Sequence, residues 1–256
     1  MFKEWIHENA KAKQSNIVLA LDLESNHQEK LLKDSFKILN KLSNLICAVK
    51  INQHLTLTLG LYDGVEKIVK LAHELNLPII MDHKISDIGN TNRFIAEHYF
   101  NVGFDALTAM PLPGWEEGLE PVFRGAQRGG RGVILIVYLS NKGAKENYER
   151  PLIDSTTGRS QLQYETFAEK AVKWGADGIV VGATRPGIIK QVYRLVGKNV
   201  PIYSPGVGVQ GGEVEPAVKN GAKYLIVGRW IINNDDQAKM TDNIRKLAWK
   251  ASEKHF

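Results

Sequence analysis

The sequence contains one cysteine, Cys47, so no disulfide can form within the chain. This residue lies in the apolar stretch ICAVK, where a small core residue is more common than a reactive thiol. Long apolar runs are also absent: no stretch approaches the roughly 18 residues of a membrane span, and residues 1–14 lack the apolar segment of a signal peptide. We therefore expect a cytoplasmic protein that is neither embedded in a membrane nor stabilised by disulfides.

The sequence has no blocks of like charge either. Its 33 Lys and Arg outnumber its 28 Asp and Glu, for a net charge of +5, but the basic residues are scattered among the acids. This pattern predicts a mild attraction for anionic ligands and no nucleic-acid surface. With 43% hydrophobic residues, the chain can bury a sizeable core.

Apolar strands alternate with helix-spaced apolar residues along the whole chain. The expected strands are residues 17–23, 46–52, 78–84, 106–110, 132–140, 178–184, 201–207 and 224–230. The expected helices are residues 2–13, 31–45, 62–75, 93–102, 115–127, 162–174, 186–196, 214–220 and 236–251. This alternation predicts an α/β fold, a single (β/α)₈ TIM barrel with a short N-terminal helical extension, residues 1–15. No linker or change of composition indicates a second domain, so residues 1–256 are expected to form one domain.

The main alternative fold is an open, doubly wound sheet. That fold would favour a G-x-G-x-x-G turn after the first strand. Residues 22–25 read Asp-Leu-Glu-Ser instead, which favours the barrel.

Charged residues end three of the predicted strands. Asp22 ends the first and Lys50 the second, while Asp82 and Lys84 end the third and point to one face, with His83 on the other. The C-terminal ends of barrel strands form one mouth, so these two lysines and two aspartates should alternate around it and keep one another ionised. A salt-bridge set that caps strands at a solvated rim would use the same residue types.

Asp87 follows Lys84 by three residues and completes the motif D-x-K-x-x-D. We expect a carboxylate, ammonium, carboxylate cluster in which Lys84 is held protonated between Asp82 and Asp87. Burial of such a cluster is costly, which favours a functional reason for it.

A second group of candidate residues lies at the ends of the last two strands. The segment SPGVGVQGGE, residues 204–213, carries Gly206, Gly208 and Gln210, and VGR, residues 227–229, carries Gly228 and Arg229. Barrels often bind phosphate at this place, because glycines let backbone N–H groups approach an anion. Gln210 and Arg229 would add a neutral donor and a charged fork. A tight turn without a ligand would also use these glycines.

The segment after the fifth strand, residues 141–160, is long, charged and rich in turn formers. Long loops without an apolar pattern are often lids over active sites. We predict a lid here, with a tolerated surface insertion as the alternative.

With these residues in hand, the chain resembles the orotidine 5′-phosphate decarboxylase family over nearly all of its length. The most specific match is D-x-K-x-x-D-I-G-N-T, residues 82–91. The resemblance implies that Asp82 lies against the substrate carboxylate and that Lys84 donates a proton to carbon 6. It also implies that Asp87 and Thr91 reach across a homodimer interface towards the ribose in the neighbouring subunit's site.

The resemblance assigns roles to residues of the other strands as well. Asp22 and Lys50 match ribose-binding residues that complete the charge network, and Ser140 matches the pyrimidine contact. Gln210 and Arg229 match the phosphate contacts. The resemblance implies a reaction that needs no cofactor and no metal ion. The longer, more charged segment after Ser140 departs from compact members of the family.

The resulting hypothesis is a cofactor-independent carboxy-lyase that converts orotidine 5′-phosphate to uridine 5′-phosphate in pyrimidine biosynthesis. One alternative is a magnesium-dependent sugar-phosphate decarboxylase or lyase of the same barrel family. In those enzymes an acidic residue takes the place of Lys50, and a lysine there would oppose metal binding. A second alternative is a non-catalytic barrel that binds nucleotides or RNA.

Overall fold

The computed structural model describes residues 1–153 and 158–252, and within them eight parallel strands form a closed barrel. Their order around the barrel is β1-β10-β9-β8-β5-β4-β3-β2. The strands are β1 (Ile17–Ala20), β2 (Ala48–Asn52), β3 (Ile79–Ile85), β4 (Ala106–Ala109), β5 (Gly132–Tyr138), β8 (Gly178–Val181), β9 (Ile202–Pro205) and β10 (Ala222–Val227). This arrangement confirms the predicted (β/α)₈ TIM barrel.

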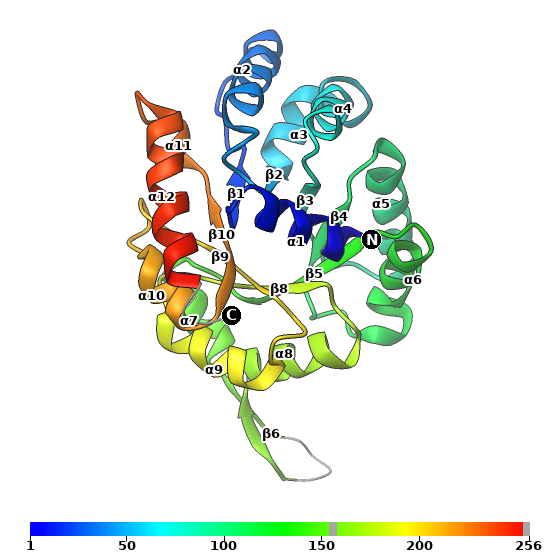
Figure 1. Ribbon diagram of the computed structural model, residues 1–256. Coiled ribbons are helices and arrows are strands. Elements are labelled where there is room, and N and C mark those ends of the chain that lie inside the picture. The colour runs from blue at the N-terminus through cyan, green and yellow to red at the C-terminus, as the bar shows by residue number, and fades with distance from the viewer. Residues whose placement is uncertain (154–157, 253–256) are drawn as a thin grey trace.

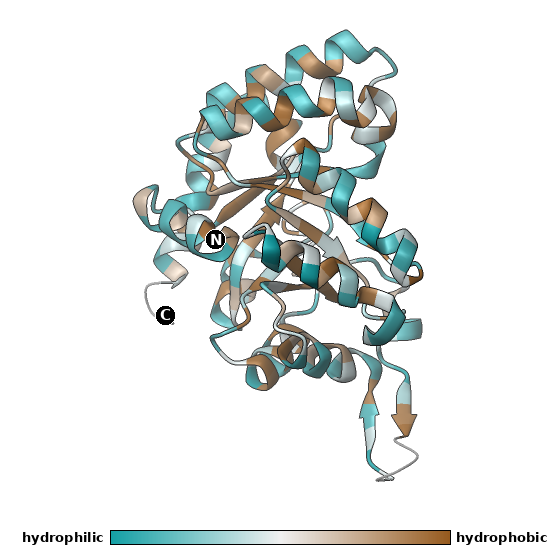
Figure 2. Ribbon diagram, turned by 90° about the vertical axis from the view of Figure 1, so that its right-hand side faces the viewer, coloured by the Kyte–Doolittle hydropathy of each residue, from teal (hydrophilic) through white to brown (hydrophobic). Residues whose placement is uncertain are grey.

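Helices surround the barrel and turn their polar faces outward (Figures 1 and 2). They are α2 (Gln28–Leu42), α3 (Gln53–Leu59), α4 (Glu66–Glu74), α5 (Gly89–Val102), α6 (Glu120–Arg128), α7 (Ala144–Tyr148), α8 (Gln163–Lys173), α9 (Pro186–Val196), α10 (Val214–Lys219), α11 (Arg229–Ile232) and α12 (Gln237–Ser252). Two π-helical turns, η1 (Gly60–Val65) and η2 (Trp115–Leu119), precede α4 and α6. Strands covered on both faces read as continuous apolar runs, and all seven residues of β5 are buried.

The N-terminal helix α1 (Phe2–Ala12) lies across the N-terminal end of the barrel, opposite the mouth (Figure 1). Its buried residues include Phe2, Ile6 and Ala10, spaced to form one apolar face. The Phe2 ring fills the space beside Gly132, where a Cβ would lie 2.4 Å from a ring atom. The apolar face of α1 therefore closes one end of the core.

Some element boundaries differ from the sequence predictions. β5 ends at Tyr138 and β8 at Val181, and β10 ends at Val227 because Arg229 already begins α11. The helix α3 was not predicted at all. Its sequence, QHLTLTL, alternates polar and apolar residues with the period of a strand, and only two of its leucines are buried.

The segment after β5 also contains structure that the sequence did not indicate. It holds the short helix α7 and an antiparallel hairpin, β6 (Pro151–Ile153) with β7 (Ser160–Leu162), that extends away from the barrel (Figures 1 and 2). The part of the predicted lid at 154–157 lies outside the described residues.

Among the described residues, no helix combines the length and the apolar character needed to cross a membrane.

Candidate active site

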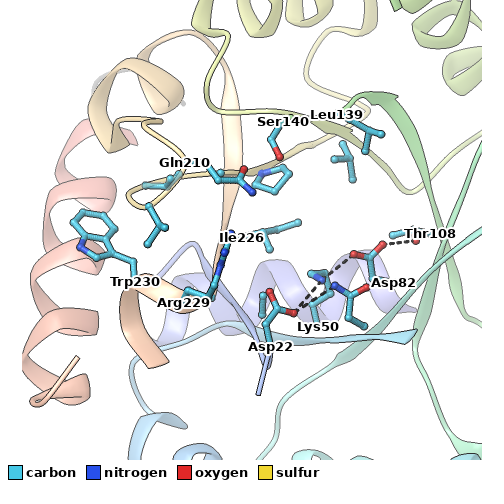
Figure 3. A pocket seen from close by; sticks show the side chains of 18 of the residues that line it. Asp22, Lys50, Asp82, Thr108, Leu139, Ser140, Gln210, Ile226, Arg229 and Trp230 are labelled. Carbon is cyan, nitrogen blue, oxygen red and sulfur yellow. Dashed lines mark hydrogen bonds and ion pairs between the residues drawn. The ribbon is translucent and has the colours of Figure 1, made fainter. Parts of the chain in front are cut away.

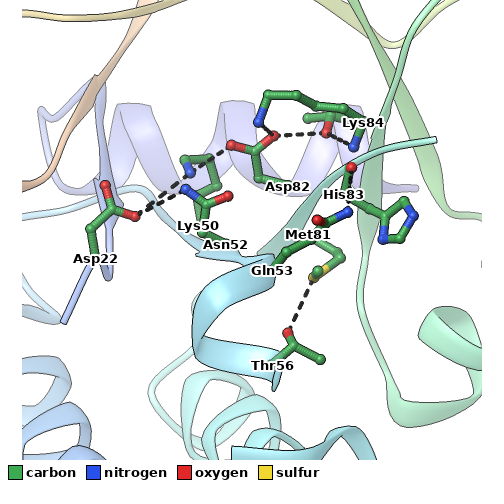
Figure 4. Close-up of polar contacts among 10 residues, drawn as sticks. Asp22, Lys50, Asn52, Gln53, Thr56, Met81, Asp82, His83 and Lys84 are labelled. Atoms are coloured by element: carbon green, nitrogen blue, oxygen red, sulfur yellow. Dashed lines mark hydrogen bonds and ion pairs between the residues drawn. The ribbon is translucent and has the colours of Figure 1, made fainter. Parts of the chain in front are cut away.

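Asp82 is the central group of a charged network at the mouth of the barrel (Figure 4). One carboxylate oxygen, Oδ2, accepts a hydrogen bond from Lys50 Nζ at 2.8 Å. The other, Oδ1, accepts one from Lys84 Nζ at 2.8 Å and one from the Thr108 hydroxyl at 2.9 Å. The charged residues of strands two and three therefore meet, as predicted. The two strands are neighbours in the sheet, and Asn52 of β2 pairs with Asp82 of β3.

Lys84 reaches back to Asp82 because the backbone of β3 is irregular at its end. Lys84 has a φ of +60°, in the left-handed region, and the register of β3 against β4 shifts between Met81 and Ile85. The Lys84 N–H donates to Thr108 Oγ1 at 2.9 Å, which holds this conformation. A non-glycine residue in this region stores backbone strain, which is common where a site fixes a side chain.

The network keeps Asp82 ionised although the residue is buried. Burial would raise the pKa of Asp82, but the charges of Lys50 and Lys84 and their hydrogen bonds outweigh it and hold this pKa well below its usual range. The Lys50 side chain is 6% exposed and that of Lys84 is 35% exposed. Lys84 is thus the more exposed of these two lysines, and Lys50 is enclosed between carboxylates.

Asp22 completes the alternation of charges. Its Oδ1 lies 4.0 Å from Lys50 Nζ and accepts a hydrogen bond from Asn52 Nδ2 at 3.4 Å. Gly228, just after β10, passes so close that a Cβ there would lie 2.9 Å from Asp22 Oδ2. Any larger residue at 228 would displace the carboxylate.

These side chains line a cavity of about 270 Å³ at the mouth (Figure 3). One wall is polar and carries Asp22, Lys50, Asp82 and Lys84. The rest of the lining includes the apolar residues Ile136, Leu139, Val180, Pro205 and Ile226, together with Ser140. An apolar slot beside a charged wall suits a flat polar ring that carries a charged substituent.

Gln210 and Arg229 lie on the far side of this cavity from Asp82 (Figure 3). The loop before Gln210 turns at Gly206, where φ is +95° and a Cβ would lie 2.7 Å from Gln210 Oε1. The N–H of Gly208 donates to the Gly212 carbonyl at 2.8 Å, so it is engaged in holding the loop. The Gly208 N–H is therefore used within the loop, whereas Gln210 and Arg229 line the cavity on this side.

Asp87 and Thr91 do not join this cavity within their own chain. Asp87 is exposed, and its Oδ1 accepts the Ile88 N–H at 2.7 Å, so the expected contact with Lys84 is not formed within one chain. The chain turns outward after β3, which carries Asp87 to a separate open cavity lined also by Ile88 and Leu112. Thr91 lies on the first turn of α5.

Two residues of the network were not found from the sequence. Thr108 lies in the middle of the predicted strand 106–110, where a threonine is an ordinary strand former, and Asn52 ends the predicted strand 46–52, where an asparagine is an ordinary cap. The only sequence feature that could have indicated these residues was a polar side chain at an inward position of an otherwise apolar strand. Both complete the hydrogen bonds of the two aspartates.

Residues 15–244 match the family model described as "Orotidine 5'-phosphate decarboxylase / HUMPS family". The chain belongs to this family. The orotidine 5′-phosphate decarboxylase of Methanococcoides burtonii is 32% identical over 232 residues, which cover 91% of this chain and 96% of the relative.

Two solved structures of the orotidine 5′-phosphate decarboxylase family illustrate the likeness in fold. The Leishmania donovani OMP decarboxylase superposes with a TM-score of 0.86 at 20% identity and covers 98% of both chains. The enzyme from Methanocaldococcus jannaschii, solved with the inhibitor BMP, has a TM-score of 0.74 at 25% identity and covers 91% of this chain and 98% of its own.

The family model also includes the group abbreviated HUMPS. The charges at the site therefore help to distinguish between the two groups. The Lys50 ammonium stands between the carboxylates of Asp22 and Asp82. Within residues 1–153 and 158–252, no group of three or more His, Cys, Asp or Glu side chains is arranged to hold a metal ion.

Proposed function

We propose that this chain decarboxylates orotidine 5′-phosphate to uridine 5′-phosphate in pyrimidine biosynthesis. The observation that carries this proposal is the network in which Lys84 is anchored on Asp82 at the edge of the mouth cavity. Membership of the decarboxylase family supports it. The test is incubation of the purified protein with orotidine 5′-phosphate while its ultraviolet absorbance is followed; no change in absorbance would contradict the proposal.

Lys84 is the group to which we assign the chemistry. Loss of carbon dioxide from carbon 6 leaves an electron pair in the plane of the ring, outside the π system, where a fixed cation can stabilise it. Lys84 Nζ, held by Asp82, stabilises this charge as it develops and then donates a proton to carbon 6. The product is uridine 5′-phosphate, and solvent reprotonates the lysine.

Asp82 and the enclosed Lys50 have supporting roles in this proposal. Asp82 orients Lys84 and lies against the substrate carboxylate, and Lys50 balances the charge of Asp82. Asp22, with Lys50, binds the ribose hydroxyls. Because the ring anion needs no electron sink, the proposed reaction uses no cofactor.

The pyrimidine ring fits the apolar part of the cavity, with Ser140 as its polar contact. The substrate phosphate binds Gln210 and Arg229, across the cavity from the reacting carbon. Binding energy gained at such a remote group can be used for closure and orientation.

A homodimer with shared sites accounts for the position of Asp87. The surface around Asp87 carries exposed apolar side chains, with Ile88 at 69% and Leu112 at 58% exposure. Exposed apolar residues gathered beside a functional residue favour a protein interface. In this proposal two chains pack at this face, and each provides Asp87 and Thr91 to the other's ribose site.

We also propose that the start of the segment after Ser140 covers bound substrate. Its base is fixed: the buried Tyr138 hydroxyl donates to Glu149 Oε1 at 2.7 Å, and the rings of Tyr138 and Tyr148 are in contact. Lys142 and Lys145 are exposed trypsin sites within it. Uridine 5′-monophosphate should slow cleavage at these two sites relative to cleavage at Lys70 on α4, and equal rates with and without the nucleotide would refute the lid.

The magnesium-dependent alternative predicts a different response to chelators. Lys50 occupies the place between two carboxylates where a divalent ion would need a third oxygen ligand. Full activity after treatment with EDTA supports the proposed reaction. Loss of activity that magnesium restores would favour the alternative. A non-catalytic RNA-binding barrel would instead give salt-dependent RNA affinity without turnover.

A further inference from the structure

A second cavity, of about 190 Å³, lies at the end of the barrel opposite the mouth. It is formed where α9 ends and where β9 and β10 begin. Lys198 and Lys223 contribute to its lining, together with Tyr193, Val200 and Ile202. Lys223 lies near the start of β10 and Arg229 two residues beyond its end, so six residues, or roughly 20 Å, separate this cavity from the mouth.

Neither lysine of this cavity has an acidic partner in the described part of the chain. Among the residues that the structure describes, no carboxylate lies within ion-pair distance of Lys198 or Lys223. Lys223 is partly buried, and its ammonium lies 5.8 Å from the centre of the Tyr224 ring. Two unpaired ammonium groups at one cavity favour an anionic occupant.

Helix α1 adds further positive charge to the same region. Lys3 and Lys11 carry this charge; they lie four residues on either side of His7 and share one face of the helix with it. Burial is the largest cause of the lowered pKa of Lys223, and the charges of Lys3 and Lys11 lower it further. Likewise, burial and then Lys223 and Lys11 lower the pKa of His7.

The acids around this basic face offset only part of its charge. Glu8 raises the pKa of His7 but is outweighed by burial and the lysines. Glu4 pairs with the N-terminal amine, and Asp177, which accepts the Val133 N–H, is close enough to Lys3 for their charges to interact. The folded chain thus holds like charges of α1 and of the barrel together, a repulsion that a bound anion would relieve.

The lining of the cavity indicates the class of anion. Val200 and Ile202 are buried and Tyr193 is half-buried, so much of the wall is apolar, and Lys198 and Lys223 contribute the charged part of the lining. Lysine ammoniums are compact point charges that suit phosphate oxygens. We propose that this cavity binds a phosphorylated small molecule, with its phosphate between Lys198 and Lys223 and its organic part against Tyr193, Val200 and Ile202.

The test is calorimetric titration of the full chain with two probes, inorganic pyrophosphate and adenosine 5′-monophosphate, with adenosine as the uncharged comparison. The variants Lys198→Met and Lys223→Met keep the length of the side chain and remove its charge. Lys219→Met, on the exposed face of α10 and paired with Glu215, removes one charge elsewhere. Arg229→Ala reports on binding at the mouth.

Wild-type protein should bind at least one phosphate probe, and each cavity variant should weaken that binding by about tenfold or more, the usual effect of losing a charge-assisted contact. Lys219→Met and Arg229→Ala should retain this binding. Tighter binding of adenosine 5′-monophosphate than of pyrophosphate would support the contact between the organic group and the apolar wall. The reverse order would show that the site binds phosphate alone and would overturn the proposed contact with the wall.

The proposal would be overturned if neither probe binds. It would also be overturned if Arg229→Ala abolishes the binding and Lys198→Met leaves it intact. The second outcome would place the anion at the mouth, so failure here is distinguishable from failure of the proposed decarboxylation. Lys198 is exposed, so its replacement tests the cavity even if Lys223→Met impairs folding.

Discussion

Lys84 and Asp82 are two residues apart on β3, yet their side chains meet, with Nζ 2.8 Å from Oδ1. The positive φ of Lys84 and its N–H contact to Thr108 produce this geometry. The ammonium is thereby fixed at the cavity before any substrate binds. A preorganised cation of this kind is the feature on which electrostatic catalysis depends.

Lys84→Ala should lower turnover by several powers of ten while the fold stays intact. Loss of one preorganised donor costs about 10² to 10³ in turnover, and this variant also loses the proton donor. Steady-state kinetics with orotidine 5′-phosphate measures the effect, and circular dichroism checks the fold. Lys70→Ala, exposed on α4, is the matched control and should be fully active. A folded Lys84→Ala protein with a tenth of wild-type activity would refute the assignment.

Asp82→Asn should destabilise the folded state at pH 7 by about 3 kcal/mol, because it leaves Lys50 and Lys84 without their shared counter-charge. The pKa of Asp82 is lower in the folded chain than in the unfolded chain, so the unfolded chain takes up the proton first as pH falls. The stability that the ionised carboxylate provides is therefore complete above about pH 5 and is lost at lower pH.

Urea unfolding of the wild type and Asp82→Asn at pH 7 and pH 3 measures this effect. The difference in unfolding free energy between the two proteins should be about 1 kcal/mol smaller at pH 3 than at pH 7. A difference that grows as pH falls would show that Asp82 is not stabilised in its ionised form.

The barrel and much of its site were predictable because they depend on the spacing of apolar residues and on the position of charged residues at strand ends. Apolar strands alternating with helices indicate the fold, and charges at strand ends meet once the strands are parallel. The network of Asp22, Lys50, Asp82 and Lys84 was predicted in this way, and the structure brings all four together.

Other features depend on tertiary contacts that no local pattern reports. The left-handed conformation of Lys84 is held by Thr108, which is 24 residues away in sequence. The same threonine donates to Asp82, 26 residues away. The strands β6 and β7 have only three residues each, and β6 is exposed, so the hairpin lacks the alternating pattern that indicates strands. The N–H of Gly208 is engaged within its own loop, which the glycine pattern alone does not reveal.

Cys47 should be unreactive in the folded protein. The residue is fully buried, its Sγ donates to the Ile17 carbonyl, and burial raises the pKa of the thiol to about 12. A negligible thiolate fraction at pH 8 leaves no nucleophile for a disulfide reagent. Ellman's reagent should therefore detect no thiol under native conditions and one per chain in guanidinium chloride. Labelling of the native protein at the rate of a free cysteine would contradict the burial.

Arg229→Ala should weaken the proposed phosphate site without changing the network around Lys84. Phosphite added with a substrate that lacks its phosphate should activate the wild type more than this variant, because the anion would bind Gln210 and Arg229 and favour the closed state. Arg194→Ala, exposed on α9, serves as the control and should be activated like the wild type. Equal activation of the wild type and Arg229→Ala would refute this role.

The proposed exchange of residues between subunits can be tested by mixing two inactive variants. Lys84 lines the cavity of its own chain, whereas Asp87 is exposed outside it. If each chain provides Asp87 to its partner, a mixed dimer of Lys84→Ala and Asp87→Ala has one site with both lesions and one with neither. Random assortment makes about half of the dimers mixed and about a quarter of all sites intact.

Subunit exchange should therefore restore about a quarter of wild-type activity. A mixture of Lys84→Ala with Lys50→Ala is the control: both residues line their own chain's cavity, so each site of the mixed dimer keeps one lesion and no activity returns. Exchange is followed by native mass spectrometry of an isotope-labelled partner. Exchange without recovery in the Asp87→Ala mixture would assign Asp87 to its own chain's site, and the outward turn after β3 would then have to reverse when substrate binds.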